Sequence, residues 1–210
     1  MIKIGLYFGS FNPVHRAHLA IAEDSLNHLD ETWFIVSPAN PDKEKTGELE
    51  DAEHRLGMTK AAVDFLREHK DVNFHVSDVE FHLPRPSWTD SSIKKIKEEL
   101  LESRGLTDDD YELYIICGRD THHRIQTWKN KDYIINNCKF FVYDRTGVDP
   151  VEDKVLHERS YYVKDLGIIP VSSTLIREKI NKGGDIYDLT LDVVECYIRN
   201  HNLYKKRKYN

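Results

Sequence analysis

The segment that decides the fold is Ile2–Leu19, which reads IKIGLYFGSFNPVHRAHL. Its first part, Ile2–Phe8, is rich in apolar residues and predicts a buried strand. A helix is predicted from about His15 to His28, because apolar residues recur near one of its faces. The short segment Gly9–Asn12 lies between them, and its backbone N–H groups can converge on an anion at the positive end of the helix dipole. The segment therefore predicts a strand, an anion-binding loop and a helix in succession.

Strands and helices continue to alternate along the chain. Further strands are expected where Ile, Val, Phe and Tyr are frequent, at Trp33–Val36, Asn73–Ser77, Leu113–Cys117 and Phe140–Tyr143. Further helices are expected from Ala52 to about Arg67, from Thr89 or Asp90 to just before Gly105, from Ser172 or Ser173 to Gly183, and from about Leu191 to His201. This order predicts an α/β fold with a Rossmann-like doubly wound parallel sheet and helices on both faces. Ligands of such sheets bind at the carboxyl ends of the strands, where strand order reverses.

The composition fits a globular protein, with 40% hydrophobic and 31% charged residues among 210. We expect a single domain over residues 1–210, with a core at about 1–170, C-terminal helices at about 171–204 and a basic tail at 205–210. No linker or repeat marks a boundary within it. Lysine and arginine in the tail resemble a nucleic-acid patch, but on an acidic protein a solvated terminus is the favoured interpretation.

The net charge of -6 argues against a general nucleic-acid binder, so anionic substrates would need positive charge gathered in a local cleft. The three cysteines are far apart and form no CxxC pair, which indicates reduced thiols rather than disulfides or a zinc site. No secretory leader is expected, because the apolar start Met1–Phe8 is too short for a signal sequence with a cleavage site. No membrane span is expected, since no apolar run approaches about 20 residues. The expected compartment is the cytoplasm.

His15 and His18 follow the first loop and are three residues apart, a spacing that puts both imidazoles on one side of a helix. Imidazoles there can donate charge-assisted hydrogen bonds to a phosphate. Taken alone, the loop could instead be an ordinary turn, and the two histidines could bind a metal or lie on the surface. A metal is disfavoured because no third ligand is evident nearby.

A second candidate for anion binding is the helix start in Pro170–Arg177, which reads PVSSTLIR. Ser172, Ser173 and Thr174 can cap the helix or present hydroxyl and N–H groups to a phosphate, and Arg177 follows one turn later. An ordinary capped helix with a surface arginine is the alternative. Together with the first loop, this segment would form the local positive cleft that an acidic chain needs.

Gly9–Leu19 resembles the phosphate-loop signature of the HIGH-type nucleotidyltransferase superfamily, in the version typical of adenylyltransferases that make NAD and coenzyme A. Pro170–Arg177 resembles the (I/V)-S-S-T-x-I-R motif of the same superfamily. The resemblance implies that His15 and His18 are catalytic. It also implies an ATP site made of Gly9, Ser10, Phe11, Asn12, Gly118, Asp120, Ser172, Ser173, Thr174, Ile176 and Arg177.

Four further stretches resemble the bacterial nicotinate-nucleotide adenylyltransferases: Val36–Lys45, His54–Met58, Leu83–Ile93, and Ile115–Asp120 with its downstream Thr127–Lys129. The second is interpreted as structural, with Met58 in the core and Arg55 tethering a loop. The others imply a mononucleotide site that includes Trp88, Thr89, Trp128 and either or both of Lys43 and Lys45. Trp88 could equally be a lid over the core, and Trp128 could instead be a core residue.

The sequence departs from this family in two places. Trp88 stands where tyrosine is usual, and Ser91 occupies the usual aspartate position, with Asp90 beside it as a substitute. Arg119, His122 and His123 are also unusual, and either add charge near the ribose or are exposed.

The resemblance implies transfer of the AMP moiety of ATP to nicotinate mononucleotide, which gives deamido-NAD and pyrophosphate. Mg²⁺ would be carried mainly by the ATP phosphates, without a dedicated protein site. Nicotinamide mononucleotide or phosphopantetheine as the acceptor, and a non-catalytic nucleotide-binding module, are the alternatives. Homo-oligomerisation stays open, and neither membrane nor nucleic-acid partners are expected.

Overall fold

In the part of the chain that the structure describes, six parallel strands form one sheet in the order β3-β2-β1-β4-β5-β6. The computed structural model describes residues 1–39, 49–143, 153–163 and 170–205. The strands are β1 (Ile2–Gly9), β2 (Glu31–Val36), β3 (Phe74–Ser77), β4 (Tyr111–Gly118), β5 (Cys138–Tyr143) and β6 (Ser160–Val163). The helices are α1 (Arg16–Ser25), α3 (Ala52–His69), η1 (Val79–His82), α4 (Thr89–Arg104), α5 (Arg119–Arg124), η2 (Ile125–Thr127), α6 (Lys131–Asn137), α7 (Lys154–Glu158), α8 (Ser173–Asn181) and α9 (Asp192–Asn200). The predicted Rossmann-like doubly wound architecture is confirmed.

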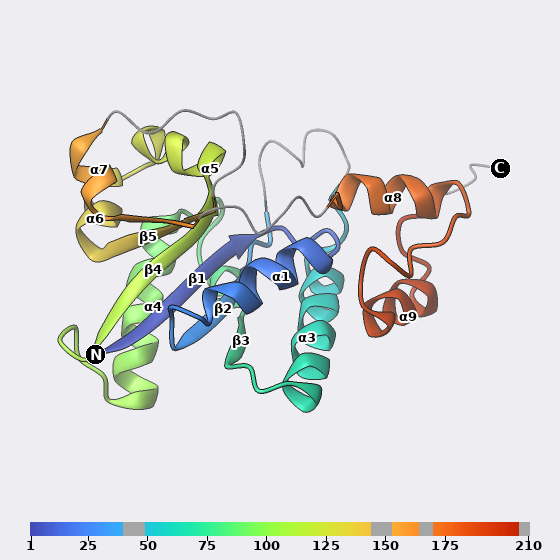
Figure 1. The fold of residues 1–210 in the computed structure, drawn as a ribbon, viewed down its shortest axis with the longest axis horizontal. Coiled ribbons are helices and arrows are strands. Elements are labelled where there is room, and N and C mark those ends of the chain that lie inside the picture. Colours follow the sequence, from blue (N-terminus) through green and yellow to red (C-terminus); the bar gives the residue numbers. More distant parts are fainter. Residues whose placement is uncertain (40–48, 144–152, 164–169, 206–210) are drawn as a thin grey trace.

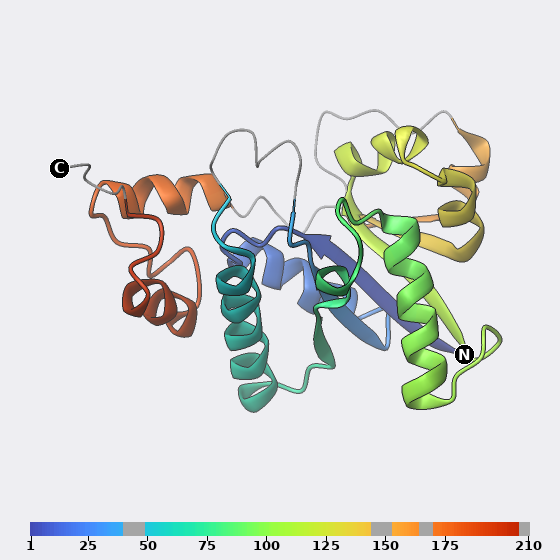
Figure 2. The ribbon, with the colours of Figure 1, turned by 180° about the vertical axis from the view of Figure 1, so that it is seen from behind.

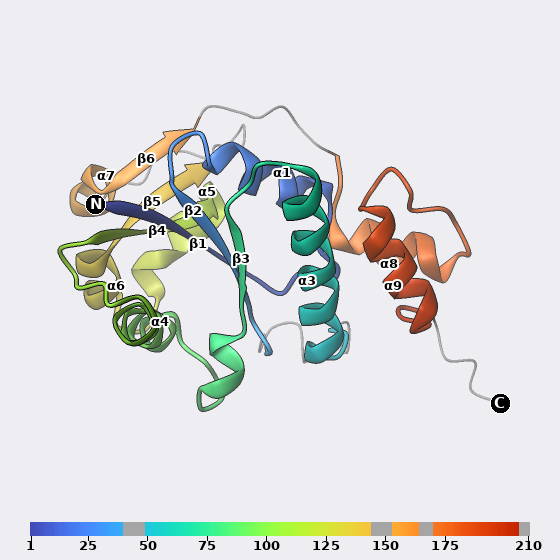
Figure 3. The same cartoon turned by 90° about the horizontal axis from the view of Figure 1, so that it is seen from below.

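Helices cover both faces of the sheet. Successive side chains of a strand point to opposite faces, so each face has its own hydrophobic core for helices to cover. Leu113 and Ile115 of β4 pack with α4 and α6, whereas Tyr114 and Ile116 pack in the core that α1, α3 and α9 complete. Figure 3 shows α1 and α3 on one side of the strands and α4 and α6 on the other. The view from behind brings α4 to the front of the sheet (Figure 2).

The sheet opens at the carboxyl ends of β1 and β4. Pairing of β1 with β2 continues to Gly9–Val36, and pairing of β4 with β5 continues to Gly118–Tyr143. Pairing between β1 and β4 ends earlier, at Leu6–Ile115. The chain builds outward from β1 to β3 and then returns to β4, so this opening lies where strand order reverses.

The C-terminal helices α8 and α9 lie at one end of the molecule, beside α3 (Figure 1). Close packing of α3 against α9 depends on Gly57, because a Cβ at that position would collide with the hydroxyl of Tyr197. Val194 and Ile198 of α9 are buried in the same core as Leu56 of α3. The division into a core, C-terminal helices and a tail stays a prediction.

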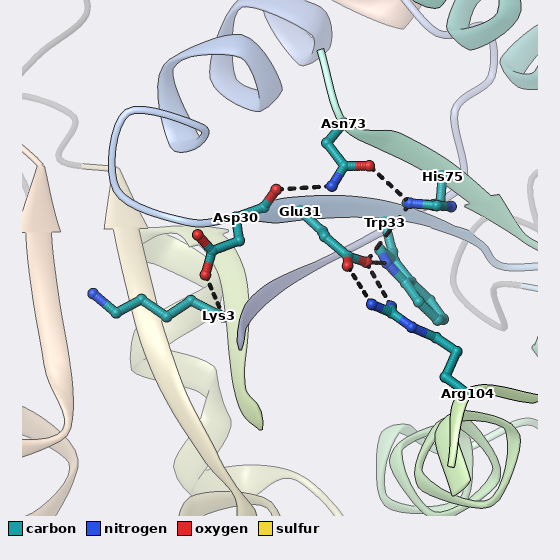
Figure 4. A network of polar contacts seen from close by, with 7 residues as sticks. All are labelled: Lys3, Asp30, Glu31, Trp33, Asn73, His75 and Arg104. Carbon is teal, nitrogen blue, oxygen red and sulfur yellow. Dashed lines mark hydrogen bonds and ion pairs between the residues drawn. The ribbon is translucent and has the colours of Figure 1, made fainter. Parts of the chain in front are cut away.

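A partly buried ion pair ties the amino end of β2 to α4 (Figure 4). Arg104 donates two hydrogen bonds to Glu31, with Nη2–Oε1 and Nη1–Oε2 distances of 2.7 and 2.9 Å, and the indole of Trp33 donates a third at 2.9 Å. Burial raises the pKa of Glu31, but the hydrogen bonds from Arg104 and Trp33 outweigh it, so the pKa lies below its ordinary value.

The predicted elements are present with small shifts of their bounds, and several short ones were not predicted. Helix α1 begins at Arg16, because His15 has an extended backbone and is the N-cap. Strand β6 and helices α5, α6 and α7 contain between four and seven residues. Segments this short give little periodicity for a sequence to reveal. Among the helices of the described ranges, none is long and apolar enough to cross a bilayer.

Candidate active site

The loop after β1 has an unusual backbone conformation at its aromatic residue, Phe11. Phe11 has a φ of 44°, a left-handed value that is uncommon for a bulky residue, and only 2% of it is exposed. Its ring packs between Tyr7, Phe34 and His18. A Cβ at Gly9 would approach Cζ of Phe11 to 2.8 Å, so the close approach of this ring requires glycine there.

The two histidines of the loop lie together, as their spacing predicts. Their rings stack with centroids 3.7 Å apart and planes inclined by 26°. His15 is the N-cap of α1 and is 5% exposed, and the ring of His18 also contacts the edge of Phe11. Both imidazoles therefore lie at the first turn of α1, directly after the carboxyl end of β1.

Carbonyl groups of this loop accept hydrogen bonds from side chains of segments that are distant in the sequence. The pairs are Arg55 Nη1 to Ser10 O at 2.7 Å, Arg177 Nη1 to Asn12 O at 3.1 Å, Ser173 Oγ to Pro13 O at 3.0 Å and Thr190 Oγ1 to Val14 O at 3.0 Å. A carbonyl and the N–H of the next residue point in opposite directions across a trans peptide. The N–H groups of Phe11, Val14 and His15 therefore point away from these donors, an arrangement suited to an anion.

Helix α8 begins against the same loop, so the two predicted anion-binding segments are neighbours. Ser172 caps α8 by accepting a hydrogen bond from Leu175 N at 3.1 Å. Ser173 and Arg177 contact the loop directly, although more than 150 residues separate the pairs along the chain. Arg177 also donates to Thr174 Oγ1 at 3.3 Å.

Ile176 differs from the other residues predicted in this segment. Its side chain is fully buried in the core, and its N–H donates to Ser172 O within the helix. Its predicted contact with ATP stays a prediction.

Arg55 tethers the loops around the site, as the sequence predicted. Its guanidinium has no exposed surface and donates to carbonyl oxygens of Ser10, Ser37, Pro38 and Glu50 at 2.6–2.9 Å. The loops after β1 and β2 are thereby fastened to the start of α3. Met58, in the same helix, is buried in the core.

Gly118 and Asp120 lie on the other side of the opening in the sheet. A Cβ at Gly118 would meet no heavy atom of the described residues within 4 Å, so the backbone there is open to a ligand. Asp120 is exposed in the first turn of α5. The positions of both fit the predicted nucleotide site, and their roles stay predictions.

His122 is buried, so the interpretation that it is simply an exposed residue is wrong. Its side chain is fully buried, and Nε2 lies 2.7 Å from Ser160 Oγ of β6. Burial, with the nearby His123 and Arg119, lowers the pKa of His122 to about 4. Arg119 is also buried, with its guanidinium 5.3 Å from the ring centroid of Tyr162. The sequence could not reveal this, because β6 was not predicted.

The loops that carry the two predicted tryptophans meet. Asp90 accepts a hydrogen bond from Asn130 Nδ2 at 2.7 Å, and Lys129 Nζ lies 5.1 Å from the ring centroid of Trp88. Trp88 is 43% exposed and Thr89 begins α4. Trp128 is partly buried against the core under α4 and α6, so it combines an accessible side with a core contact. Lys43 and Lys45 lie outside the described residues.

Glu80 is a buried carboxylate that the sequence did not indicate. It is 4% exposed and accepts hydrogen bonds from Ser92 Oγ at 2.8 Å and Ser87 Oγ at 3.1 Å. Burial raises the pKa of Glu80 despite these hydrogen bonds. Glu80 thus supports the loop that carries Trp88. No local pattern distinguishes it from the other acidic residues of a charged chain.

The fold and the convergence of two helix starts on one loop are typical of a protein that binds nucleotide phosphates. A model of the cytidylyltransferase-like family matches residues 6–179, which places the chain in that class of nucleotidyltransferases. A probable nicotinate-nucleotide adenylyltransferase of Flavobacterium johnsoniae is 35% identical over 207 residues, covering 98% of this chain and all of the relative. Another from Bacteroides fragilis is 37% identical over 186 residues, covering 88% of this chain and 85% of the relative. The chain belongs to the nicotinate-nucleotide adenylyltransferase family.

A solved structure shares the whole fold. The Plasmodium falciparum nicotinic acid mononucleotide adenylyltransferase complexed with NaAD has a TM-score of 0.73 and 22% identity, covering 97% of this chain and 98% of that one. At this identity the likeness establishes the common architecture, including the C-terminal helices.

Proposed function

We propose that this chain transfers the AMP moiety of ATP to nicotinate mononucleotide and releases deamido-NAD and pyrophosphate. One observation carries the proposal: the loop after β1, with its stacked His15 and His18, and the start of α8 meet at the opening between β1 and β4. The similarity to relatives described as nicotinate-nucleotide adenylyltransferases supports the choice of acceptor.

The reaction is an in-line displacement at the α-phosphorus of ATP. An oxygen of the mononucleotide 5′-phosphate forms the new P–O bond, and the bond from the α-phosphorus to the bridging oxygen of the β-phosphate breaks. The attacking phosphate is already ionised, so no general base is needed. Catalysis then consists of positioning and of stabilising developing charge.

The chain's own residues divide this work. His15, His18 and the N–H groups of the Gly9–Asn12 loop stabilise charge on the α-phosphoryl oxygens. Ser173, Thr174 and Arg177 hold the β- and γ-phosphates that leave as pyrophosphate. Ser10 and Phe11 of the loop and Ser172 at the start of α8 complete the ATP site. Arg177 lies against Asn12 O and Thr174 Oγ1, which places its guanidinium at the start of α8 beside the loop.

Gly118 and Asp120 receive the nucleoside of ATP. Trp88, Thr89 and Trp128 receive the mononucleotide, together with either or both of Lys43 and Lys45. Among the described residues no three His, Cys, Asp or Glu side chains could hold a metal together. We expect Mg²⁺ to be carried through ATP phosphates and water, where the ion would neutralise phosphate charge. A cytoplasmic location remains the expectation.

Pyrophosphate release tests the proposal directly. Purified protein with ATP and Mg²⁺ is given nicotinate mononucleotide, nicotinamide mononucleotide or phosphopantetheine in turn. We expect release with nicotinate mononucleotide at a kcat/KM well above that with the amide. Faster turnover of the amide would change the substrate assignment, and release with none of them would refute adenylyl transfer.

A further inference from the structure

The turn after α9 reaches back to the loop after β1. The hydroxyl of Tyr204 donates a hydrogen bond to Asn12 Oδ1 at 3.0 Å, although 192 positions separate the two residues. The backbone N–H of Tyr204 contacts Glu50 Oε2 at 3.4 Å. Leu203, between this contact and α9, is 5% exposed and packs in the core. The last described turn of the chain is thus anchored by the packing of Leu203 and by the two polar contacts of Tyr204.

The backbone of this turn adopts conformations that residues with a Cβ rarely take. Asn202 has a φ of 52° and Tyr204 a φ of 61°. Such conformations cost free energy and persist where the surrounding contacts hold them. Here they turn Leu203 into the core while the phenol of Tyr204 points to the loop.

The contact with Tyr204 orients the carboxamide of Asn12. Oδ1 of Asn12 also lies 3.2 Å from the backbone N–H of Glu50. Since this N–H can only donate, the atom facing it is the oxygen, and the amide nitrogen lies on the other side of the group. Arg177 holds the carbonyl of the same residue, and Asn12 is 2% exposed. Both the side chain and the main chain of Asn12 are therefore fixed by C-terminal residues.

The phenol is a stable donor in this position. Burial, and then the carboxylate of Glu50, raise the pKa of Tyr204, while Arg55 and Arg177 oppose the shift without cancelling it. The hydroxyl keeps its proton throughout the neutral range and can donate to Asn12 at any working pH.

We propose that Tyr204 is a positioning residue for adenylyl transfer, which acts through Asn12 to hold the Gly9–His18 loop in its phosphate-binding geometry. This role rests on the proposed function. A partly buried tyrosine that only fills space would not need its hydroxyl, whereas here the hydroxyl makes the contact. Small displacements of a loop that stabilises charge in the transition state reduce kcat more than they weaken acceptor binding.

The test compares Tyr204→Phe with Tyr197→Phe as a matched control. Both variants keep an aromatic ring and lose one long-range hydroxyl contact of the C-terminal part. Tyr197 OH contacts His54 Nδ1 at 3.3 Å and does not contact the loop. We expect kcat to fall about tenfold in Tyr204→Phe, with the KM for nicotinate mononucleotide within about twofold of wild type. Tyr197→Phe should leave kcat within about twofold of wild type.

A double-mutant cycle separates this role from a general structural one. In an Asn12→Ala background, Tyr204→Phe should lower kcat little further, because its effect passes through Asn12. Equal effects of Tyr204→Phe in both backgrounds would overturn the proposal. So would the same kcat for the two tyrosine variants.

Amide hydrogen exchange gives a readout that does not need turnover. We expect faster exchange of the amides in Ser10–His18 for Tyr204→Phe and unchanged exchange there for Tyr197→Phe. Unchanged exchange in Tyr204→Phe would overturn the positioning role. If the wild type released no pyrophosphate with any acceptor, the proposed function would fail, and the exchange result alone would decide whether Tyr204 holds the loop.

Discussion

The stacked imidazoles of His15 and His18 carry the most direct prediction about catalysis. His18→Ala should lower kcat by about 100-fold and change the KM for the mononucleotide little, because charge-assisted hydrogen bonds strengthen as negative charge develops. Steady-state pyrophosphate release measures both constants. His69→Ala, at an exposed position in α3, is the control and should behave as wild type. An unchanged kcat in His18→Ala would remove His18 from the mechanism.

His122 makes a different prediction, about pH and stability. Its pKa is about 4 in the folded protein and near 6.5 in the unfolded chain. Between these values the unfolded chain binds a proton that the folded protein does not, so this residue lowers stability as pH falls from 6.5 to 4. Full titration would cost roughly 3 kcal/mol.

His122→Leu removes that titration. Urea unfolding at several pH values should show the variant gaining stability relative to wild type as pH falls, by as much as roughly 3 kcal/mol near pH 4. Loss of the hydrogen bond to Ser160 shifts the difference at pH 7, but it does not create a pH dependence. A difference that stays constant from pH 7 to 4 would contradict the lowered pKa.

Among the elements, the end of β4 is where a substitution can block the nucleotide without disturbing the packing of the protein. Gly118 has a φ of -79°, which alanine adopts readily, and a Cβ there meets no described atom within 4 Å. Gly118→Ala should therefore keep the midpoint of urea unfolding and raise the KM for ATP on the order of tenfold, because the methyl group occupies the nucleotide's approach.

Gly57→Ala is the opposite case and serves as the comparison. Its methyl group would collide with Tyr197 in the packing of α3 on α9, so stability should fall by about 1–3 kcal/mol. Normal ATP kinetics in Gly118→Ala would show that the nucleotide does not pass close to the end of β4.

At the scale of the whole molecule, the Glu31–Arg104 pair joins the sheet to α4 far from the site. Glu31→Gln should reduce the free energy of unfolding at pH 7 by about 2 kcal/mol, since it leaves Arg104 without its carboxylate. The pKa of Glu31 is lowered on folding, so its contribution is present above the unfolded value of about 4.5 and is lost as pH falls through the folded pKa. The difference between variant and wild type should therefore shrink in acid.

Glu98→Gln is the matched control, because Glu98 pairs with Lys95 on the exposed side of α4. Its effect should stay below about 0.5 kcal/mol at every pH. Equal effects of the two substitutions would show that burial of Glu31 adds nothing to the value of its ion pair.

The local parts of the site could be predicted because local physics sets them. The helix start at Ser172 followed from its capping side chain. The closeness of His15 and His18 followed from their spacing at a helix start, although His15 is the N-cap and lies outside the helix itself. The apolar periodicity of the chain likewise indicated a doubly wound sheet, since alternating strands and helices bury both faces of a parallel sheet. These features depend on neighbours within a few residues.

Which segments meet was decided only in the tertiary structure. The return of the chain to place β4 beside β1 opens the sheet after Leu6. The C-terminal part of the chain brings Arg177 and Tyr204 onto Asn12. Burial of His122 against Ser160 likewise depends on the edge strand β6, which is too short to be predicted from its sequence pattern. Such contacts join residues far apart in the chain, and no local pattern carries information about a partner that only the order of the strands brings near.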